Sequence, residues 1–173
     1  MRGETAERIL DAAEKRVRRA GYNGFSFRDI AKDVGVKSAS VHHHFPTKGA
    51  LVARLAERYT ERFMTALEAA ARTEGSVPAM RRLFRKSLED DNRMCLCGMM
   101  AAESDTLPPT AAAAARRFFE RLLDALGGGP SSQDAATRQR AFHIVATLEG
   151  ALLLARVLGD PGAFDRATEA LSV

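Results

Sequence analysis

The amino-acid sequence predicts an all-α fold of about nine helices, on three observations. Apolar residues recur at spacings of three and four through most of the chain, which places them on one face of a helix. Breaks that contain glycine or proline separate these stretches from one another. No stretch shows the sustained alternation of apolar and polar residues, bounded by turn residues, that is typical of a half-buried strand.

Capping residues and breaks divide the chain into helices joined by short connections. Ser26 and Asp29 have the spacing of a capping box at the start of the second helix, and Gly35 permits the tight turn that follows it. Pro46 ends the third helix, because the residue before a proline is disfavoured in the helical conformation. Helices are expected at residues 5–20, 26–34, 37–45, 47–74, 79–89, 96–103, 110–126, 132–158 and 161–171, with a break at 90–92.

The excess positive charge lies at the N-terminal end of the chain. Residues 1–48 carry ten Lys and Arg against six Asp and Glu, whereas residues 49–173 carry sixteen of each, so the net charge of +4 belongs to the first 48 residues. A polyanionic partner is favoured there, because neutralising phosphates releases counterions. The alternative is that these basic residues form a solvated face that binds no partner.

Composition excludes several classes of protein. The chain has no run of 18 or more apolar residues, so no membrane span is expected, and its N-terminus is too charged for a signal peptide. The two cysteines, Cys95 and Cys97, are too close in sequence to staple a fold, which favours a reducing, cytoplasmic location. No nucleophile–base spacing, phosphate-binding glycine loop or metal triad appears, so we expect no enzyme activity and no cofactor.

Residues 26–48 have the layout of a helix-turn-helix, in which the second helix enters the major groove of DNA. Lys37 can reach guanine, and the small side chain of Ala39 allows close approach to a thymine methyl group. The start of the helix after Pro46 favours a phosphate, and the ammonium group of Lys48 is the favoured phosphate clamp. The DNA contacts expected from this pattern are Lys37, Ser38, Ala39, Ser40, His42, His43, Thr47 and Lys48.

The histidine run at residues 42–44 also raises the possibility of a metal site. Adjacent residues of a helix point about 100° apart, so the three rings cannot converge on one ion. We therefore expect no metal there.

A family resemblance follows from the residues around this pattern. Five short segments carry the resemblance, in this order along the chain: Ile9-Leu-Asp-Ala-Ala13, Gly21-Tyr22, Phe27-Arg-Asp-Ile-Ala31, Gly35-Val36 and Ser40-Val-His-His-His-Phe-Pro-Thr-Lys48. Together they resemble the N-terminal domain of TetR-family transcriptional regulators over roughly residues 5–60. The sequence departs from the family pattern at Lys37, where a Ser or Thr is common, and at His42 and His43, where tyrosines are frequent.

The resemblance implies a fold, a function and further site residues. It implies a helix-turn-helix domain at 1–48 and a helical ligand-binding and dimerisation domain at 49–173. It also implies a homodimeric repressor that leaves a palindromic operator when a small apolar or amphipathic effector enters each subunit. Arg28 aligns with a family position that often touches DNA.

Candidate residues for the pocket and the dimer interface lie in the second half of the chain. Small and apolar residues at spacings of three and four suggest a dimer interface at Ile144, Leu148, Ala151, Leu152 and Ala155. The apolar candidates for the pocket have an ordinary core role as the alternative. The expected pocket lining is Met64, Leu67, Phe84, Met99, Glu103, Phe118, His143 and Thr147.

Two other kinds of regulation remain open. The regulator can act without a ligand, constitutively or through a protein partner. It can also sense oxidants or electrophiles through Cys95 and Cys97, although cysteines most often fill a core.

Overall fold

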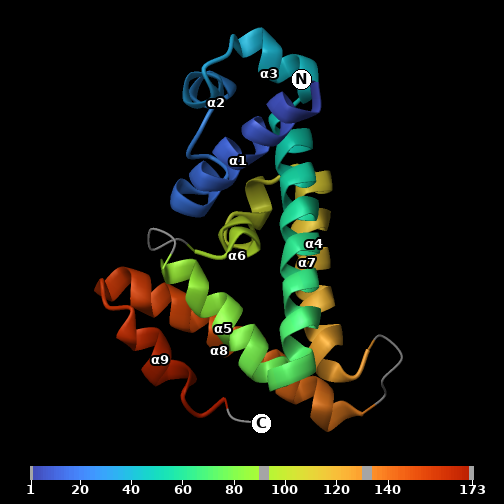
Figure 1. The fold of residues 1–173 in the computed structure, drawn as a ribbon, viewed down its shortest axis with the longest axis vertical. Coiled ribbons are helices and arrows are strands. Elements are labelled where there is room, and N and C mark those ends of the chain that lie inside the picture. The colour runs from blue at the N-terminus through green and yellow to red at the C-terminus, as the bar shows by residue number, and fades with distance from the viewer. Residues whose placement is uncertain (1, 90–93, 130–133, 172–173) are drawn as a thin grey trace. The chain divides into compact units, whose positions relative to one another are not determined.

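The computed structural model describes residues 2–89, 94–129 and 134–171, and confirms the all-α prediction (Figure 1). The described residues form nine α-helices and one short 3-10 helix, and contain no strand. In chain order these are α1 (Arg2–Ala20), α2 (Phe27–Val34), α3 (Ser38–His44), α4 (Lys48–Glu74), α5 (Ser76–Glu89), α6 (Leu96–Ala101), η1 (Ser104–Thr106), α7 (Pro109–Gly127), α8 (Ala135–Leu158) and α9 (Gly162–Thr168).

Helix ends differ from the predictions where proline is tolerated. The expected helices at 47–74 and 79–89 leave a break at 75–78, but α5 begins at Ser76 and includes Pro78. Proline is tolerated there because the first turn of a helix does not need the N–H that proline lacks. Only Gly75, with a φ of 86°, separates α4 from α5. The expected break at 90–92 and the expected helix start at 132 lie outside the described residues.

The first compact unit contains residues 1–59 and 96–116. Within it, α1 packs against α2, α3 and α6, and α2 packs against α3 (Figure 1). Arg58 of α4 pairs with three carboxylates on α1, at 2.7 Å from Glu7, 2.8 Å from Asp11 and 3.4 Å from Glu14. The unit's buried apolar core includes Ile9, Ala13, Val17, Phe27, Ile30, Val34, Val41, Phe45, Leu51 and Leu55.

Local capping fixes both ends of α2. The Ser26 side chain accepts a hydrogen bond from the Asp29 N–H, and the Asp29 carboxylate accepts one from the Ser26 N–H at 2.8 Å. At the other end Gly35 adopts the left-handed conformation, with a φ of 73°, and the chain turns toward α3. Both features are those that the sequence predicted.

The second compact unit contains residues 60–95 and 117–173. In it α8 packs against α5 and α9 (Figure 1). The Phe63 ring meets the rings of Phe84 and Phe118 edge-on, with centroids 5.6 and 5.4 Å away. Arg85 on α5 binds the carboxylate of Asp165 on α9 at 3.1 Å. The core of this unit thus contains a group of three phenylalanine rings, and an ion pair joins two of its helices.

The two compact units differ from the division that the sequence suggests. The first unit continues beyond residue 48 and also takes in α6, η1 and the start of α7. This division describes packing, so a functional boundary at residue 48 stays a prediction.

Candidate nucleic-acid interface

The helix expected to read DNA is held by two buried side chains and leaves its other side open. Val41 and Phe45 are buried in the first unit, and the backbone N–H of Phe45 donates to the Val41 carbonyl at 2.9 Å. Lys37 adopts an extended conformation immediately before α3, so the helix begins at Ser38. Of the nine predicted DNA contacts, Arg28, Lys37, Ala39, His42, His43 and Thr47 are exposed, whereas Ser38, Ser40 and Lys48 are half-buried.

The ammonium group of Lys48 is turned into the first unit. It donates a hydrogen bond to the Phe25 carbonyl at 2.5 Å and lies over the rings of Tyr22 and Phe25, at 4.5 and 4.3 Å from their centroids. Burial lowers the pKa of Lys48, and the nearby carboxylate of Glu103 partly offsets that effect. In this conformation the charge of Lys48 is used within the protein, which does not favour the predicted phosphate clamp; a phosphate contact of Lys48 stays a prediction. No pattern in the sequence indicates that Lys48 would lie over the rings of Tyr22 and Phe25.

The start of α4 still has the features of a phosphate contact. The Thr47 hydroxyl accepts a hydrogen bond from the Ala50 N–H at 3.0 Å, so Thr47 caps the helix as expected. Helix N-termini attract anions through their N–H groups and the helix dipole. The hydroxyl of Thr47 and the turn that it caps, rather than the ammonium group of Lys48, are the part of this helix that can face phosphate.

The side chains of His42, His43 and His44 contact different aromatic rings. The His42 ring contacts the Phe27 ring edge-on, with centroids 4.6 Å apart, and the His43 ring contacts that of His44 at 5.5 Å. Among residues 2–89, 94–129 and 134–171, no group of three or more His, Cys, Asp and Glu side chains is arranged to hold a metal ion. The contact with Phe27 orients His42 on the exposed side of α3.

Comparison with known proteins identifies the family. Residues 9–55 match the family model of bacterial regulatory proteins of the tetR family, and residues 69–170 match that of the LmrA/YxaF-like transcriptional regulator C-terminal domain. The chain belongs to the TetR family. It is a transcriptional regulator with a DNA-binding helix-turn-helix, as the sequence predicted.

Solved structures and a curated relative agree with this membership. A TetR-family regulator from Agrobacterium tumefaciens is 30% identical, with a TM-score of 0.89 over 98% of this chain and 96% of that chain. One from Legionella pneumophila is 31% identical, with a TM-score of 0.86 over 95% and 94%. The probable HTH-type transcriptional regulator YttP of Bacillus subtilis (strain 168) is 32% identical over 71 residues, which are 41% of this chain and 34% of that relative. The match thus spans about a third of the curated relative.

The predicted pocket residues of this TetR-family chain are divided between the two compact units. Met64, Leu67, Phe84 and Phe118 are buried in the core of the second unit. Met99 lies on α6 in the first unit. The alternative of a core role is thus favoured for the four buried residues.

Glu103 has a different role from the one predicted. Its carboxylate accepts a hydrogen bond from the backbone N–H of Tyr22, in the turn between α1 and α2. Nearby, the Asn23 amide donates to the Thr106 hydroxyl at 3.1 Å. The Glu103 carboxylate is thus bound within the first unit, which does not favour a role in an effector pocket.

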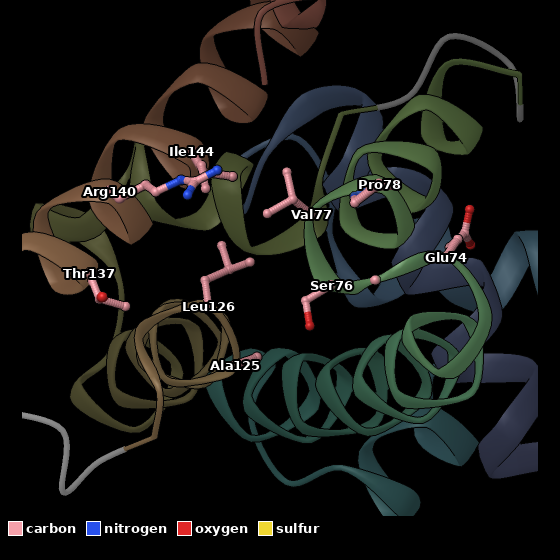
Figure 2. Close-up of a pocket in the computed structure, with 10 residues that line it drawn as sticks. Glu74, Ser76, Val77, Pro78, Ala125, Leu126, Thr137, Arg140 and Ile144 are labelled. Atoms are coloured by element: carbon pink, nitrogen blue, oxygen red, sulfur yellow. The ribbon is translucent and has the colours of Figure 1, made fainter. Parts of the chain in front are cut away.

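Two cavities open in the second unit. One, of about 370 Å³, is lined by two of the candidate pocket residues, His143 and Thr147, together with Arg140, Ile144, Ala167, Ala170 and Leu171. That an effector binds there stays a prediction. The other, of about 270 Å³, lies where α5 begins and α7 ends; Figure 2 shows Val77 and Leu126 extending into the space, with Arg140 of α8 alongside. Sequence reasoning missed this second cavity, because its lining comes from helix ends that carry no shared pattern.

The predicted dimer face of α8 is the wrong face. Ile144, Leu148, Ala151, Leu152 and Ala155 are at most 4% exposed, because they pack inside the subunit. The apolar side chains that α8 leaves in solvent are Phe142, Leu153, Leu154, Val157 and Leu158, which are 49–74% exposed.

The two apolar faces of α8 also bear on membrane spanning. The helix is long and apolar enough to cross a membrane by length and composition, a test that core helices of soluble proteins also pass. Here one face of α8 belongs to the core of the second unit.

The two cysteines are both buried, at 1% exposure for Cys95 and 0% for Cys97. Structural buried thiols are generally unreactive, so this burial favours the packing role. Sensing through either thiol remains a hypothesis.

Proposed function

We propose that this TetR-family regulator is a homodimeric repressor that binds a palindromic operator and leaves it when a small-molecule effector binds. One observation carries the proposal: Val41 and Phe45 anchor α3 while Lys37, Ala39 and His43 stay exposed. A helix held from one side, with small and basic residues on the other, suits the major groove. Such a regulator acts in the cytoplasm, where it meets DNA.

The exposed apolar side of α8 supports the homodimer. Phe142, Leu153 and Val157 recur at intervals of eleven and four residues, so they share one side of the helix. Gly150 lies between them, and a Cβ added to it would meet nothing within 4 Å. A second helix can approach closely there. Contiguous exposed apolar side chains of this size mark interaction sites, and a second copy pairing α8 with α8 is the occupant that we propose.

The oligomeric state tests the dimer. Leu153→Asp and Val157→Asp place a charge on this side of α8, so sedimentation should show monomers. Thr73→Asp, at an exposed position of α4, adds the same charge elsewhere and should leave the dimer intact. Monomeric wild-type protein, or variants that still dimerise, would contradict the proposed face.

The DNA-binding claim is tested by selection from random duplex DNA. A twofold dimer should enrich a palindrome whose half-sites are about one helical turn or more apart. Binding should also weaken steeply with salt, because phosphate contacts release counterions. Failure to enrich any palindrome would contradict the proposal.

The effector claim has its own test. Thermal shifts with a metabolite panel identify compounds that bind, and each hit is then added to the protein–operator complex. Release of the operator by a stabilising compound is expected. Compounds that bind without releasing DNA would instead favour a ligand-independent or partner-controlled regulator.

A further inference from the structure

One acidic side chain in the second unit is buried without a full set of partners. Glu149 lies on α8, and its Oε1 atom is buried with no hydrogen-bond partner. The carboxyl group hydrogen-bonds to the side chain of Cys95. A thiol is only a weak donor, so this bond offsets little of the cost of burying a carboxylate.

Glu149 lies on a part of α8 that contributes to the core. Leu148, next to it in sequence, and Leu152, three residues further on, are both fully buried, and its hydrogen-bond partner Cys95 is 1% exposed. Burial raises the pKa of the Glu149 carboxyl to about 7, with the Cys95 hydrogen bond acting in the opposite direction. An apolar residue would fill this position at lower cost, since an unpaired buried carboxylate is expensive. Such a group in a folded protein calls for a partner that the chain does not supply.

We propose that Glu149, with Cys95 beside it, recognises an effector that carries a protonated amine. This inference rests on the proposed ligand-controlled function and names the class of its ligand. An ammonium N–H donates to the carboxylate and neutralises its charge, which gives a charge-assisted hydrogen bond. A neutral alcohol gives a weaker bond, and an anionic ligand is repelled.

A ligand must reach an Oε1 atom that is buried, although the residue as a whole is only half-buried. We expect a rotation of the side chain about its own bonds to bring Oε1 to the ligand.

The position of Cys95 in the chain connects this site to DNA binding. Cys95 directly precedes α6, and α6 packs against α1 of the first unit. Glu103, just beyond α6, holds the backbone N–H of Tyr22. A ligand that replaces Cys95 as the partner of Glu149 therefore changes a contact one residue before α6, the helix that packs against α1 in the first unit.

Matched ligands test the recognition on the full-length protein. The probes are benzylamine, benzyl alcohol and benzoate, and the parallel set octylamine, octanol and octanoate, with binding measured by calorimetry and thermal shift at neutral pH. The amine of at least one set should bind about tenfold or more tightly than its alcohol, and the carboxylate most weakly.

Two variants separate recognition from a structural role. Glu149→Gln keeps the shape but removes the charge, so amine affinity should fall about tenfold while alcohol affinity stays unchanged. Glu169→Gln removes an exposed carboxylate of the same unit and should change neither. Cys95→Ser keeps a hydroxyl donor beside Glu149 and should retain the preference for amines.

Three results would overturn the inference: no preference for the amine in either set, equal amine binding by Glu149→Gln, or loss of the preference in Glu169→Gln. Selection of operator DNA with the same proteins distinguishes a failure of the amine inference from a failure of the proposed function. If the protein enriches a palindrome but shows no preference for amines, the repressor proposal is retained and only the inference of an amine effector is contradicted. A protein that binds amines but enriches no palindrome contradicts the repressor.

Discussion

The carboxylate of Glu103 accepts a hydrogen bond from the backbone N–H of Tyr22 and thereby ties the segment between α6 and α7 to the turn between α1 and α2. Three further contacts of this segment and of α6 lie within the first unit. The Thr106 hydroxyl accepts a hydrogen bond from the Asn23 amide, Pro108 lies against Gly49 at the start of α4, and α6 packs on α1. The orientation of the helix-turn-helix therefore depends on residues more than fifty positions away in the sequence.

Removing the Glu103 carboxylate should destabilise the first unit. Glu103→Ala leaves the partly buried Tyr22 N–H without its acceptor, at a cost of about 1–2 kcal/mol in the free energy of unfolding. Glu103→Gln retains an acceptor oxygen and should cost less. Urea denaturation measures both variants, and wild-type stability for Glu103→Ala would show that the bond contributes nothing.

Gly21 provides an independent check of the same contact. It has a φ of 75°, and an added Cβ would lie 2.6 Å from the Glu103 Oε2 atom. Gly21→Ala should therefore cost more than the roughly 1 kcal/mol of backbone strain expected of Gly35→Ala. Gly35 is the matched control, because its φ is 73° and nothing lies within 4 Å of an added Cβ. In a Glu103→Ala background the difference between the two substitutions should shrink; an unchanged difference would argue against the contact.

Lys48 should act on stability rather than on phosphate binding. Lys48→Met removes the hydrogen bond to Phe25 and the two ring contacts, with an expected loss of about 1–2 kcal/mol in unfolding free energy. The salt dependence of operator binding should stay as in the wild type. Lys37→Ala should do the reverse, weakening operator binding with little effect on stability, because Lys37 is exposed. If operator binding by Lys48→Met depends less steeply on salt than binding by the wild type, Lys48 does contact phosphate.

Glu149 should make stability fall as pH rises. Its pKa is raised from 4.5 to about 7 in the folded protein, so between these values the folded state binds more protons than the unfolded state. The free energy of unfolding therefore falls from about pH 4.5 upward, and the full penalty is present above pH 7. Glu149→Gln should be more stable than the wild type at about pH 8, by on the order of 1–3 kcal/mol, and equal to it in acid. Parallel denaturation curves at the two pH values measure this; a constant difference would exclude the carboxyl group as the cause.

Local features of the fold could be predicted from the sequence because local chemistry determines them. The capping box of Ser26 and Asp29 and the left-handed turn at Gly35 depend on residues within a few positions of one another. The burial of Val41 and Phe45 follows from their spacing on one short helix.

The remaining features depend on contacts distant in sequence. Periodicity identified α8 as an apolar helix, but Leu152 and Leu153 are adjacent in sequence, and only packing makes the first buried and the second exposed. Lys48 and Glu103 looked like surface residues that meet ligands, yet both are bound to the segment from Tyr22 to Phe25. Nothing in the sequence distinguished Glu149 from other acidic residues, because its unpaired oxygen results from tertiary burial alone.

Selection from random duplex DNA, repeated with a variant of α3, tests the central claim most directly. The wild type should enrich a palindrome. Lys37→Gln should enrich one that differs from it at the same position of each half-site, because Lys37 is exposed at the start of α3 and can reach a base there. Lys32→Gln, at an exposed position of α2 outside the proposed contacts, should return the wild-type sequence. An identical sequence for all three proteins, or no enrichment for the wild type, would contradict the proposal that α3 reads DNA.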